Sequence, residues 1–440
     1  MRLSRRTFLG ASAAFAATPA FAQIPSSGYV DVVVIGAGAA GIAAARKLAA
    51  AGRRIAVVEA ADRVGGRCFS ESRTFGMPYD RGAHWIYAPD VNPVAKLAPR
   101  GFDVYVAPQG QKVRVGRRDA RAGEMEAFLV ALVRARRAIQ DAARGKTDVS
   151  CAKALPADLG EWKAPIEFLL GPRTLGKDLD DVSAMDFARA VERDSEAFCR
   201  QGYGALIARL AEGLPVQLST PATRILSTRT DIEVETAKGR LGARAAIVTV
   251  STNVLASGKI RLGAEPPKRQ VDAATKLSLG SQDFVALELA GNPLQLLNDD
   301  LVFEKASGAR TGAFLANVAG SPLCLVSVGG KFGRTLAAEG EKAMTAFAVD
   351  WLASLYGNDI RKAVGRTHAT NWNAEPLVMG AASAATPGSQ GSRRILMEPL
   401  RERIFFAGEA VHETLYGTVE GAWESGERAA DAVMKLLGRR

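Results

Sequence analysis

One stretch near the start of the chain constrains the fold more than any other. Residues 29–35 (YVDVVVI) form an apolar, β-branched run that is typical of a buried parallel strand. The string GAGAAG follows at residues 36–41, and an alanine-rich helical segment then runs to about Ala51. A second short strand, residues 54–58, ends at Glu59. A strand, a glycine turn, a helix and a later acid together form the dinucleotide-binding fingerprint.

Each part of the glycine turn has a physical role. Gly36 permits the tight turn, Gly38 lets a pyrophosphate approach the backbone, and Gly41 lets the helix pack closely on the strand. The amides at the helix start, at Ala39 and Ala40, offer unpaired N–H groups and the positive end of the helix dipole to the phosphates.

The residues after the second strand narrow the choice of dinucleotide. Glu59 can accept hydrogen bonds from the ribose hydroxyls, and an acid there disfavours the 2′-phosphate of NADP. Ala60 follows, and the chain then reaches Gly66 and Arg67. Gly66 lets the backbone pass close to a cofactor, whereas Arg67 faces the cofactor or forms a surface salt bridge. This E-x-x-x-x-x-G-G-R string resembles the FAD-binding signature of the flavin-containing amine oxidase superfamily.

The resemblance spans most of residues 29–440, and its motifs occur in family order. Monoamine oxidases, polyamine oxidases and the flavin histone demethylase share this pattern. The family segments are similar to YDRGAHWI at 79–86, GYGAL at 202–206, the strands at 219–225 and 245–250, IFFAGEA at 404–410 and GTVEGA at 417–422.

The resemblance implies that the cofactor is FAD. Binding should be non-covalent, because the flavin-linked cysteine of monoamine oxidases would fall near Ala381. The resemblance places Ala222 at the adenine side and Glu409 at ribityl or phosphate groups. The amides of Thr418 and Val419 would face the flavin pyrimidine edge and stabilise negative charge on reduced flavin. The expected cofactor contacts are Gly36, Gly38, Ala39, Ala40, Gly41, Glu59, Ala60, Gly66, Arg67, Gly82, Ala83, His84, Trp85, Ala222, Gly408, Glu409, Thr418 and Val419.

The expected fold class is α/β, with a Rossmann-like FAD-binding domain and a discontinuous α+β substrate domain, as in amine oxidases and glutathione-reductase-like proteins. Residues 121–145 have helical periodicity, and residues 380–393, rich in Ala, Ser and Gly, should form a loop at the substrate pocket. The predicted FAD-binding domain comprises residues 29–100, 200–265 and 395–440, and the predicted substrate domain comprises residues 101–199 and 266–394.

The function implied by the resemblance is oxidation of a small-molecule amine. The flavin would take a hydride equivalent from the carbon beside a neutral amine, and the resulting imine would hydrolyse. An apolar pocket would favour the neutral amine, because burying an unpaired ammonium is costly.

Three departures from the family pattern qualify this function. Many members carry a lysine that holds a water near the flavin, in a G-x-x-x-K stretch. Here Phe284 takes that place, unless the alignment is displaced by a residue or two, and Lys276 lies on the wrong side of Gly280. Flavin reoxidation should therefore differ. Ala382 and Thr418 stand where monoamine oxidases place two aromatic rings, so that cage is expected to be absent. The third departure is the missing flavin-linked cysteine.

Four residues are candidates for catalysis: His84, Trp372, Thr418 and Phe284. Histidine titrates near neutral pH, so His84 could donate to a substrate or relay a proton. Alternatively, His84 is held by backbone groups and only supports the residues that contact the ligand. Trp372 either lines the pocket or packs in the core. Two other functions remain open: a desaturase or oxidase of a hydrophobic substrate, and a non-catalytic flavoprotein that partners another subunit.

The first 22 residues predict export. Arg5 and Arg6 precede an apolar run that ends in an A-x-A cleavage site, as in a secretory signal peptide. The string SRRTFL resembles a twin-arginine signal, which implies a periplasmic protein loaded with its cofactor in the cytoplasm. The alternative is a basic, disordered N-terminus.

Composition limits the partners. The formal net charge is +11, but the basic residues are scattered, so a solvated basic surface is favoured over nucleic-acid binding. An acidic periplasmic electron acceptor could use such a surface. No long apolar stretch predicts a transmembrane helix in the mature chain. The four cysteines form no C-x-x-C pair and the three histidines lie far apart, so no metal site is expected.

Overall fold

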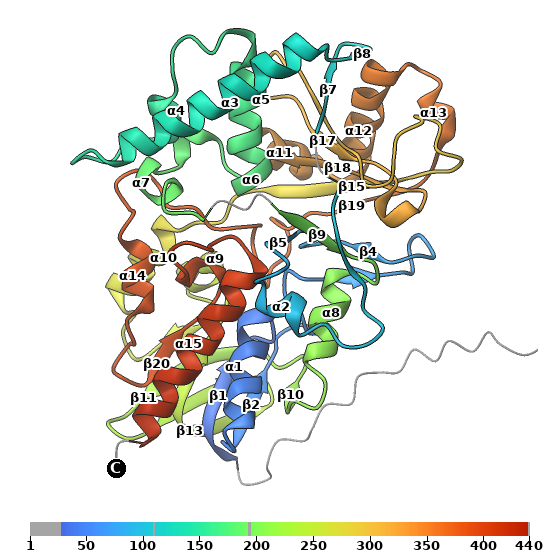
Figure 1. The fold of residues 1–440 in the computed structure, drawn as a ribbon. Helices are drawn as coiled ribbons and strands as arrows, with labels where there is room; N and C mark the ends of the chain where they lie inside the picture. Colours follow the sequence, from blue (N-terminus) through green and yellow to red (C-terminus); the bar gives the residue numbers. More distant parts are fainter. Residues whose placement is uncertain (1–27, 109–110, 192–194, 439–440) are drawn as a thin grey trace, which may run out of the picture.

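The computed structural model describes residues 28–108, 111–191 and 195–438, so the predicted signal at 1–22 lies outside the described residues. Figure 1 shows two parts, each built around its own sheet, with one stacked above the other.

The lower part contains an eight-stranded sheet with the order β10-β2-β1-β13-β12-β11-β14, in which β20 also pairs with β13. The strands β1, β2, β10, β13 and β20 run parallel where they pair, and most of their side chains are buried. The bounds are β1 (Tyr29–Ile35), β2 (Ile55–Val58), β10 (Val216–Gln217), β11 (Ala222–Ser227), β12 (Ile232–Thr236), β13 (Gly239–Val248), β14 (Arg261–Leu262) and β20 (Ile404–Phe406).

Two helices from opposite ends of the chain cover one face of this sheet. In Figure 1, α1 (Ala39–Ala50) and α15 (Val419–Gly438) lie side by side. They can approach closely because α1 is rich in alanine and α15 has a glycine at the contact. A Cβ on Gly426 would lie 2.1 Å from the Ala40 carbonyl oxygen. Small residues therefore fix the distance between the two helices.

The upper part is built on a seven-stranded sheet with the order β19-β15-β18-β17-β16-β7-β8. All neighbouring pairs are antiparallel except β16 and β7. Helices α11 and α12 pack on it through a shared apolar core. The bounds are β7 (Lys112–Val115), β8 (Arg118–Asp119), β15 (Gln282–Leu289), β16 (Leu301–Glu304), β17 (Ala313–Leu315), β18 (Leu323–Gly329), β19 (Val364–Ala369), α11 (Gly330–Ala338) and α12 (Glu341–Tyr356).

Short elements connect these two parts. Two small sheets comprise β3 (Ser70–Glu71) with β4 (Tyr79–Asp80), and β9 (Glu196–Cys199) between β5 (Ile86–Tyr87) and β6 (Val104–Val106). The remaining helices are α2 (Pro93–Lys96), α3 (Ala122–Ala143), α4 (Cys151–Ala154), α5 (Lys163–Leu170), α6 (Pro172–Leu175), α7 (Ala184–Phe187), α8 (Tyr203–Leu210), α9 (Thr252–Ala256), α10 (Lys268–Lys276), α13 (Ile360–Ala363) and α14 (Ser392–Met397), with the 3-10 turns η1 (Gly160–Trp162), η2 (Leu179–Asp181), η3 (Val318–Gly320) and η4 (Glu409–Val411).

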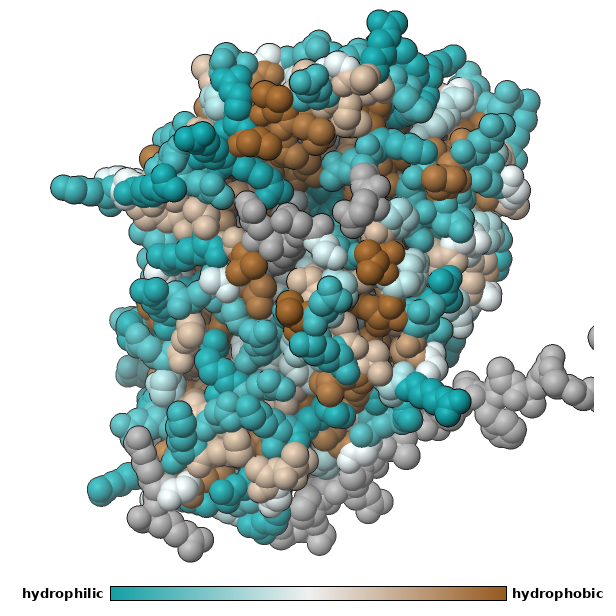
Figure 2. Space-filling view, in the orientation of Figure 1, coloured by the Kyte–Doolittle hydropathy of each residue, from teal (hydrophilic) through white to brown (hydrophobic). Residues whose placement is uncertain are grey.

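The surface is mostly hydrophilic. Figure 2 shows apolar residues gathered in the upper part of the molecule, in the region where Figure 1 places α3 and α5. Leu129, Val130 and Val133 are exposed on α3, whereas Phe128, on another side of that helix, is buried. Apolar side chains on α3 therefore point both into the core and out to solvent.

The sequence predicted several elements closely. The helix expected to run to about Ala51 ends at Ala50, and the helical periodicity of 121–145 corresponds to α3. Residues 380–393 are largely irregular, although α14 begins at Ser392 and Ser383 forms an isolated bridge with Leu279. The predicted limits of the two domains stay predictions.

Candidate functional site

The carboxyl ends of four parallel strands meet at one edge of the lower sheet. Gly36 follows β1, Glu59 follows β2, Thr249 follows β13, and the turn containing Gly408 follows β20. The Thr249 hydroxyl donates to the Ile35 carbonyl oxygen over 2.9 Å, which ties two of these turns together. Ligands of open α/β sheets bind outside this edge.

The glycine turn leaves open space where a pyrophosphate would approach. A Cβ on Gly36, whose φ is +104°, would lie 2.5 Å from the Thr249 hydroxyl oxygen, and a Cβ on Gly41 would lie 1.9 Å from the Gly36 carbonyl oxygen. Around Gly38 the nearest atom would be 3.9 Å away. Gly38 is also the N-cap of α1 and has no side chain to bond the first amides. Those amides, at Ala39 and the next residues, suit an anionic ligand.

Glu59 is held beside this turn. Its carboxylate accepts from the Ala37 amide over 2.6 Å and from the Ala61 amide over 2.8 Å. Burial raises the pKa of Glu59, although these amide hydrogen bonds oppose the rise. A carboxylate has about four acceptor positions, so two remain for ribose hydroxyls. The Thr220 amide donates to the Glu59 carbonyl oxygen, which brings the start of β11, with Ala222, to the same edge.

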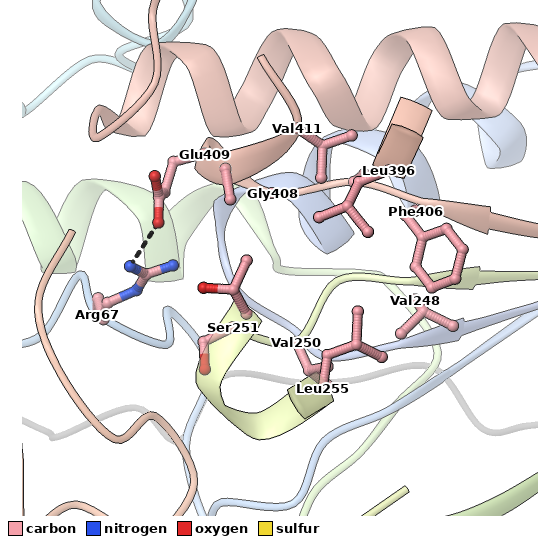
Figure 3. A pocket seen from close by; sticks show the side chains of 13 residues that line it. Arg67, Val248, Val250, Ser251, Leu255, Leu396, Phe406, Gly408, Glu409 and Val411 are labelled. Carbon is pink, nitrogen blue, oxygen red and sulfur yellow. Dashed lines mark hydrogen bonds and ion pairs between the residues drawn. The ribbon is translucent and has the colours of Figure 1, made fainter. Parts of the chain in front are cut away.

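Arg67 and Glu409 form an ion pair over a pocket at this edge (Figure 3). Arg67 Nη1 lies 2.8 Å from Glu409 Oε1 and also donates to the Ala381 carbonyl oxygen. The sequence left open whether Arg67 faces the cofactor or forms a salt bridge at the surface. Its partner, the Glu409 side chain, is almost fully buried, so this ion pair is not a surface salt bridge. In Figure 3 the opposite side of the pocket is apolar, formed by Val248, Leu255, Leu396, Phe406 and Val411.

Trp372 packs against the segment that contains Gly82. A Cβ on Gly82 would lie 1.8 Å from the Arg67 carbonyl oxygen and 3.1 Å from the Trp372 ring. The Trp372 indole donates to the Arg81 carbonyl oxygen over 2.9 Å, and its amide donates to Asp283 over 2.9 Å. Trp372 therefore fixes this segment. Burial raises the pKa of Asp283 to about 6, although the hydrogen bonds that it accepts oppose the rise.

Phe284 belongs to an aromatic cluster that also contains His84, Trp85 and Phe198. Side chains alternate along a strand, so Phe284 projects from the face of β15 opposite to Asp283. The Phe284 and Trp85 rings lie 6.1 Å apart at 28°, and the His84 ring stacks on Phe198 at 4.6 Å. Phe284 thus places an apolar ring at the position that the sequence comparison assigned to the lysine of many family members. Lys276, the other lysine considered, pairs with Asp272 at the surface.

His84 is buried and held by a carboxylate. Its Nδ1 lies 2.8 Å from Asp80 Oδ2, and Asp80 also accepts from the Ser70 hydroxyl and the Tyr203 amide. An ionised carboxylate only accepts, so Nδ1 is the donor to Asp80, and in the neutral ring Nε2 is then an acceptor. Within the part of the chain that the structure describes, Nε2 has no hydrogen-bond partner. His84 and Asp80 also line a second pocket, together with Tyr105 and Arg200.

Thr418 has a local role through its side chain. Its hydroxyl donates to the Leu415 carbonyl oxygen over 2.6 Å and accepts from the Gly421 amide over 2.9 Å, which caps α15. The side chain is therefore engaged in the helix start, and α15 begins at Val419. A Cβ on Gly417 would lie 3.5 Å from the Ala382 methyl group, so the two places assigned to the family's aromatic rings lie close together.

Sequence reasoning missed four buried charged residues near these positions: Asp80, Asp283, Asp186 and Arg393. Asp80 was within reach, because it stands in the same motif as His84. The ion pair of Asp186 with Arg393 left no local signal, since its members are far apart in the chain. No group of three or more His, Cys, Asp or Glu within the described ranges could hold a metal ion, and none of the described helices could cross a bilayer.

The fold and this edge define a two-part flavoprotein: the open face at Gly38, the uncapped helix start and the Glu59 carboxylate fit the dinucleotide part of FAD. The model of the family "Flavin containing amine oxidoreductase" matches residues 174–434, and the "NAD(P)-binding Rossmann-like domain" matches residues 34–98. The chain belongs to the flavin-containing amine oxidoreductase family.

Curated relatives are distant but extensive. Lysine-specific histone demethylase 2 of Homo sapiens is 25% identical over 439 residues, covering 92% of this chain and 53% of that protein. Polyamine oxidase 3 of Oryza sativa subsp. japonica is 26% identical over 457 residues, covering 93% of this chain and 90% of that protein. The chain thus spans about half the length of the demethylases it matches and most of the length of the polyamine oxidases.

Solved structures show the same fold. Wild-type putrescine oxidase bound to putrescine has a TM-score of 0.79 at 20% identity, covering 92% of this chain and 99% of that chain. Cyclohexylamine oxidase from Brevibacterium oxydans IH-35A has a TM-score of 0.78 at 20% identity, covering 93% and 100%. The predicted α/β class, with a Rossmann-like FAD-binding domain and a separate substrate domain, is confirmed. FAD is the cofactor, as predicted, and its non-covalent attachment stays a prediction.

Proposed function

We propose that this chain is an FAD-dependent amine oxidoreductase for a small-molecule amine. The match to the amine oxidoreductase family over residues 174–434 carries the proposal. Bound FAD would supply the hydride acceptor for the carbon beside the amine nitrogen, and the imine product would hydrolyse in water. Putrescine oxidase, cyclohexylamine oxidase and polyamine oxidase, which the chain resembles, support an amine as the donor.

The residues of the aromatic cluster suit an amine. His84 Nε2 is an acceptor that could take the proton of an ammonium group, and Asp80 would stabilise the imidazolium that forms. The rings of Trp85, Phe198 and Phe284 make the surroundings of His84 apolar. Such surroundings favour the neutral form of an amine over the ammonium form. The test is anaerobic mixing of the purified holoenzyme with putrescine, longer polyamines, cyclohexylamine and amino acids, while flavin absorbance is followed at about 450 nm.

Each result of this screen has a clear meaning. Bleaching by an amine supports the proposal. If no amine bleaches the flavin and an apolar compound without an amine, added to the same screen, does, the result would favour a desaturase instead. A yellow protein that no donor bleaches would favour a non-catalytic flavoprotein subunit, which the replacements at Phe284 and Ala382 would also suit.

We also propose that the electrons pass to a periplasmic acceptor rather than rapidly to oxygen. The buried Phe284 ring, in the place where many family members carry a lysine, supports this choice of acceptor. Stopped-flow mixing of reduced enzyme with air-saturated buffer tests it, because fast reoxidation would contradict it.

Export by the twin-arginine pathway is part of the same proposal. It rests on Arg5, Arg6 and the A-x-A site of residues 1–22. Replacing both arginines with lysine should leave the protein, with its flavin, in the cytoplasm. Periplasmic recovery of that variant at the wild-type level would contradict this route.

A further inference from the structure

A buried ion pair joins the upper part of the molecule to the segment beside the cofactor edge. Arg393 on α14 donates from Nε to Asp186 Oδ1 over 2.8 Å and from Nη2 to Oδ2 over 2.7 Å. The Arg393 and Asp186 side chains are 1% and 0% exposed. The guanidinium also lies 3.7 Å from the centroid of the Tyr416 ring. Such a two-bonded buried pair is rigid, and removing either member leaves an uncompensated charge.

This ion pair continues to Glu409 through one hydroxyl. Arg393 Nη1 donates to Ser383 Oγ over 3.0 Å, and Ser383 Oγ donates to Glu409 Oε2 over 2.7 Å. A serine hydroxyl has one proton, so the directions of both hydrogen bonds are determined here. The Ser383 hydroxyl accepts from Arg393 and donates to Glu409. Glu409 in turn pairs with Arg67. We call Asp186, Arg393, Ser383, Glu409 and Arg67 the Arg393 network.

Two residues of this network, together with Lys177, hold the segment 381–385 along its length. Arg67 donates to the Ala381 carbonyl oxygen, and Asp186 accepts from the Ala385 amide over 3.0 Å. The buried Lys177 donates to the Ala384 carbonyl oxygen over 2.7 Å. Three charged side chains thus hold the backbone of this segment of alanines and one serine, in which Ser383, Ala384 and Ala385 are fully buried.

The Arg393 network keeps Glu409 ionised. Burial alone would raise the pKa of Glu409, but the Arg67 guanidinium, the Ser383 hydroxyl and Arg393 together outweigh burial and hold this pKa below its usual range. An ionised Glu409 is what fixes the Arg67 guanidinium at the pocket of Figure 3. Arg67 and Glu409 are therefore preset by residues that do not face that pocket.

We propose that Asp186, Arg393 and Ser383 are positioning residues for FAD: they hold Glu409 and Arg67 in the geometry that retains the cofactor. The inference rests on FAD binding by the chain and extends it to three residues that make no contact with the pocket. Ser383 is the informative residue, because alanine there removes the hydroxyl that joins Arg393 to Glu409, but keeps the residue 383 amide bond to Glu409 and the ion pair of Asp186 with Arg393.

The experiment compares holoenzymes of the wild type, Ser383→Ala and a matched control, Ser389→Ala. Ser389 is also buried and lies four residues beyond that segment, and its hydroxyl accepts from the Thr386 hydroxyl. The rate of FAD release on dilution is followed by flavin fluorescence, and the flavin reduction potential is measured against reference dyes. Thermal unfolding of the three apoproteins is followed by circular dichroism.

Ser383→Ala should release FAD about tenfold faster or more, as expected for a lost hydrogen bond to a charged group, and should shift the flavin potential. Ser389→Ala should match the wild type in both. The Ser383→Ala apoprotein should also unfold at a lower temperature, because the lost hydroxyl bonds two buried charged groups without FAD as well, so the release rate and the flavin potential decide the inference. Wild-type release and potential in Ser383→Ala would overturn the inference, as would equal changes in Ser389→Ala. A wild type that binds no FAD would instead overturn FAD binding itself.

A second pair of variants tests the arginine. Arg393→Met should lose FAD during purification, whereas Arg394→Met should retain it, because Arg394 on the same helix pairs with Glu413 at the surface. If Arg393→Met does not fold, Ser383→Ala still decides the question. A folded Arg393→Met that keeps its full FAD content would contradict the inference.

Discussion

Replacing Gly38 with alanine should separate cofactor binding from folding. Gly38 has φ −77° and ψ −177°, an extended conformation that alanine also adopts. The nearest atoms to an added Cβ, on Gly65 and Gly66, would lie 3.9 and 4.0 Å away, at ordinary contact distance. The apoprotein should therefore keep most of its stability, because restriction of the unfolded chain, worth about 0.4–1 kcal/mol, offsets the preference for glycine over alanine at a helix N-cap.

The added methyl group would lie where the pyrophosphate approaches the turn. A hydrogen bond to a charged group contributes about 1.5–3 kcal/mol, so loss of one such bond should weaken FAD binding by about 10- to 150-fold. The assay titrates apoprotein with FAD by flavin fluorescence and measures urea unfolding of the same apoprotein. Wild-type affinity in Gly38→Ala, or a clearly less stable apoprotein, would refute the reasoning.

Gly41→Ala is the matched control for this experiment. Its Cβ would lie 1.9 Å from the Gly36 carbonyl oxygen, so the backbone of the turn must move. This variant should destabilise the apoprotein, by an amount typical of overpacking, about 1–3 kcal/mol or more. Gly38→Ala should therefore change FAD affinity and Gly41→Ala should change apoprotein stability, although the two glycines stand three positions apart in one motif.

Three further predictions concern the upper part of the site. Because burial raises the pKa of Asp283 to about 6 in the folded state, the stability due to its protonated form is lost as pH rises through that value. Relative to the wild type, Asp283→Asn should therefore gain up to about 3 kcal/mol of unfolding free energy between about pH 4 and 7, and a pH-independent difference would contradict this. His84→Asn should lower kcat/KM by about 10²-fold or more and alter its pH profile at unchanged FAD content, whereas wild-type kinetics would exclude a role for Nε2. Phe284→Lys should accelerate reoxidation by oxygen without changing the anaerobic reduction rate. An unchanged reoxidation rate would contradict the proposal that Phe284 slows the reaction of the reduced flavin with oxygen.

Local spacing carried most of what the sequence could predict. The strand, glycine turn and helix of residues 29–50 lie within one continuous stretch, and Glu59 follows the neighbouring strand, so their mutual positions follow from strand and helix geometry. The resemblance of residues 404–410 to the family motif, rather than local spacing, placed Gly408 and Glu409 after a short strand. The sequence could not show that Glu409 pairs with Arg67, because this contact depends on how β20 aligns beside β13.

Side-chain partners explain where sequence reasoning stopped. His84 could be read as reactive or supporting, and the decisive partner, Asp80, contacts it only because the chain turns between β4 and β5. The sequence assigned the Thr418 amide to the flavin. The structure shows that the Thr418 hydroxyl also caps α15, as is typical of a threonine directly before a helix. Asp186 and Arg393 come from separate parts of the chain, so no local pattern could pair them.

The order in which the lower sheet is assembled has a consequence for biosynthesis. Its first strand, β1, is synthesised before the rest of the sheet, but β20 and the helix that packs on α1 come from residues 404–438. A ribosome-bound chain therefore lacks one wall of the cofactor crevice until those residues have emerged. FAD can be captured only after synthesis has passed them, so nascent chains truncated before residue 404 should neither hold the vitamin-derived cofactor nor bury the apolar face of α1.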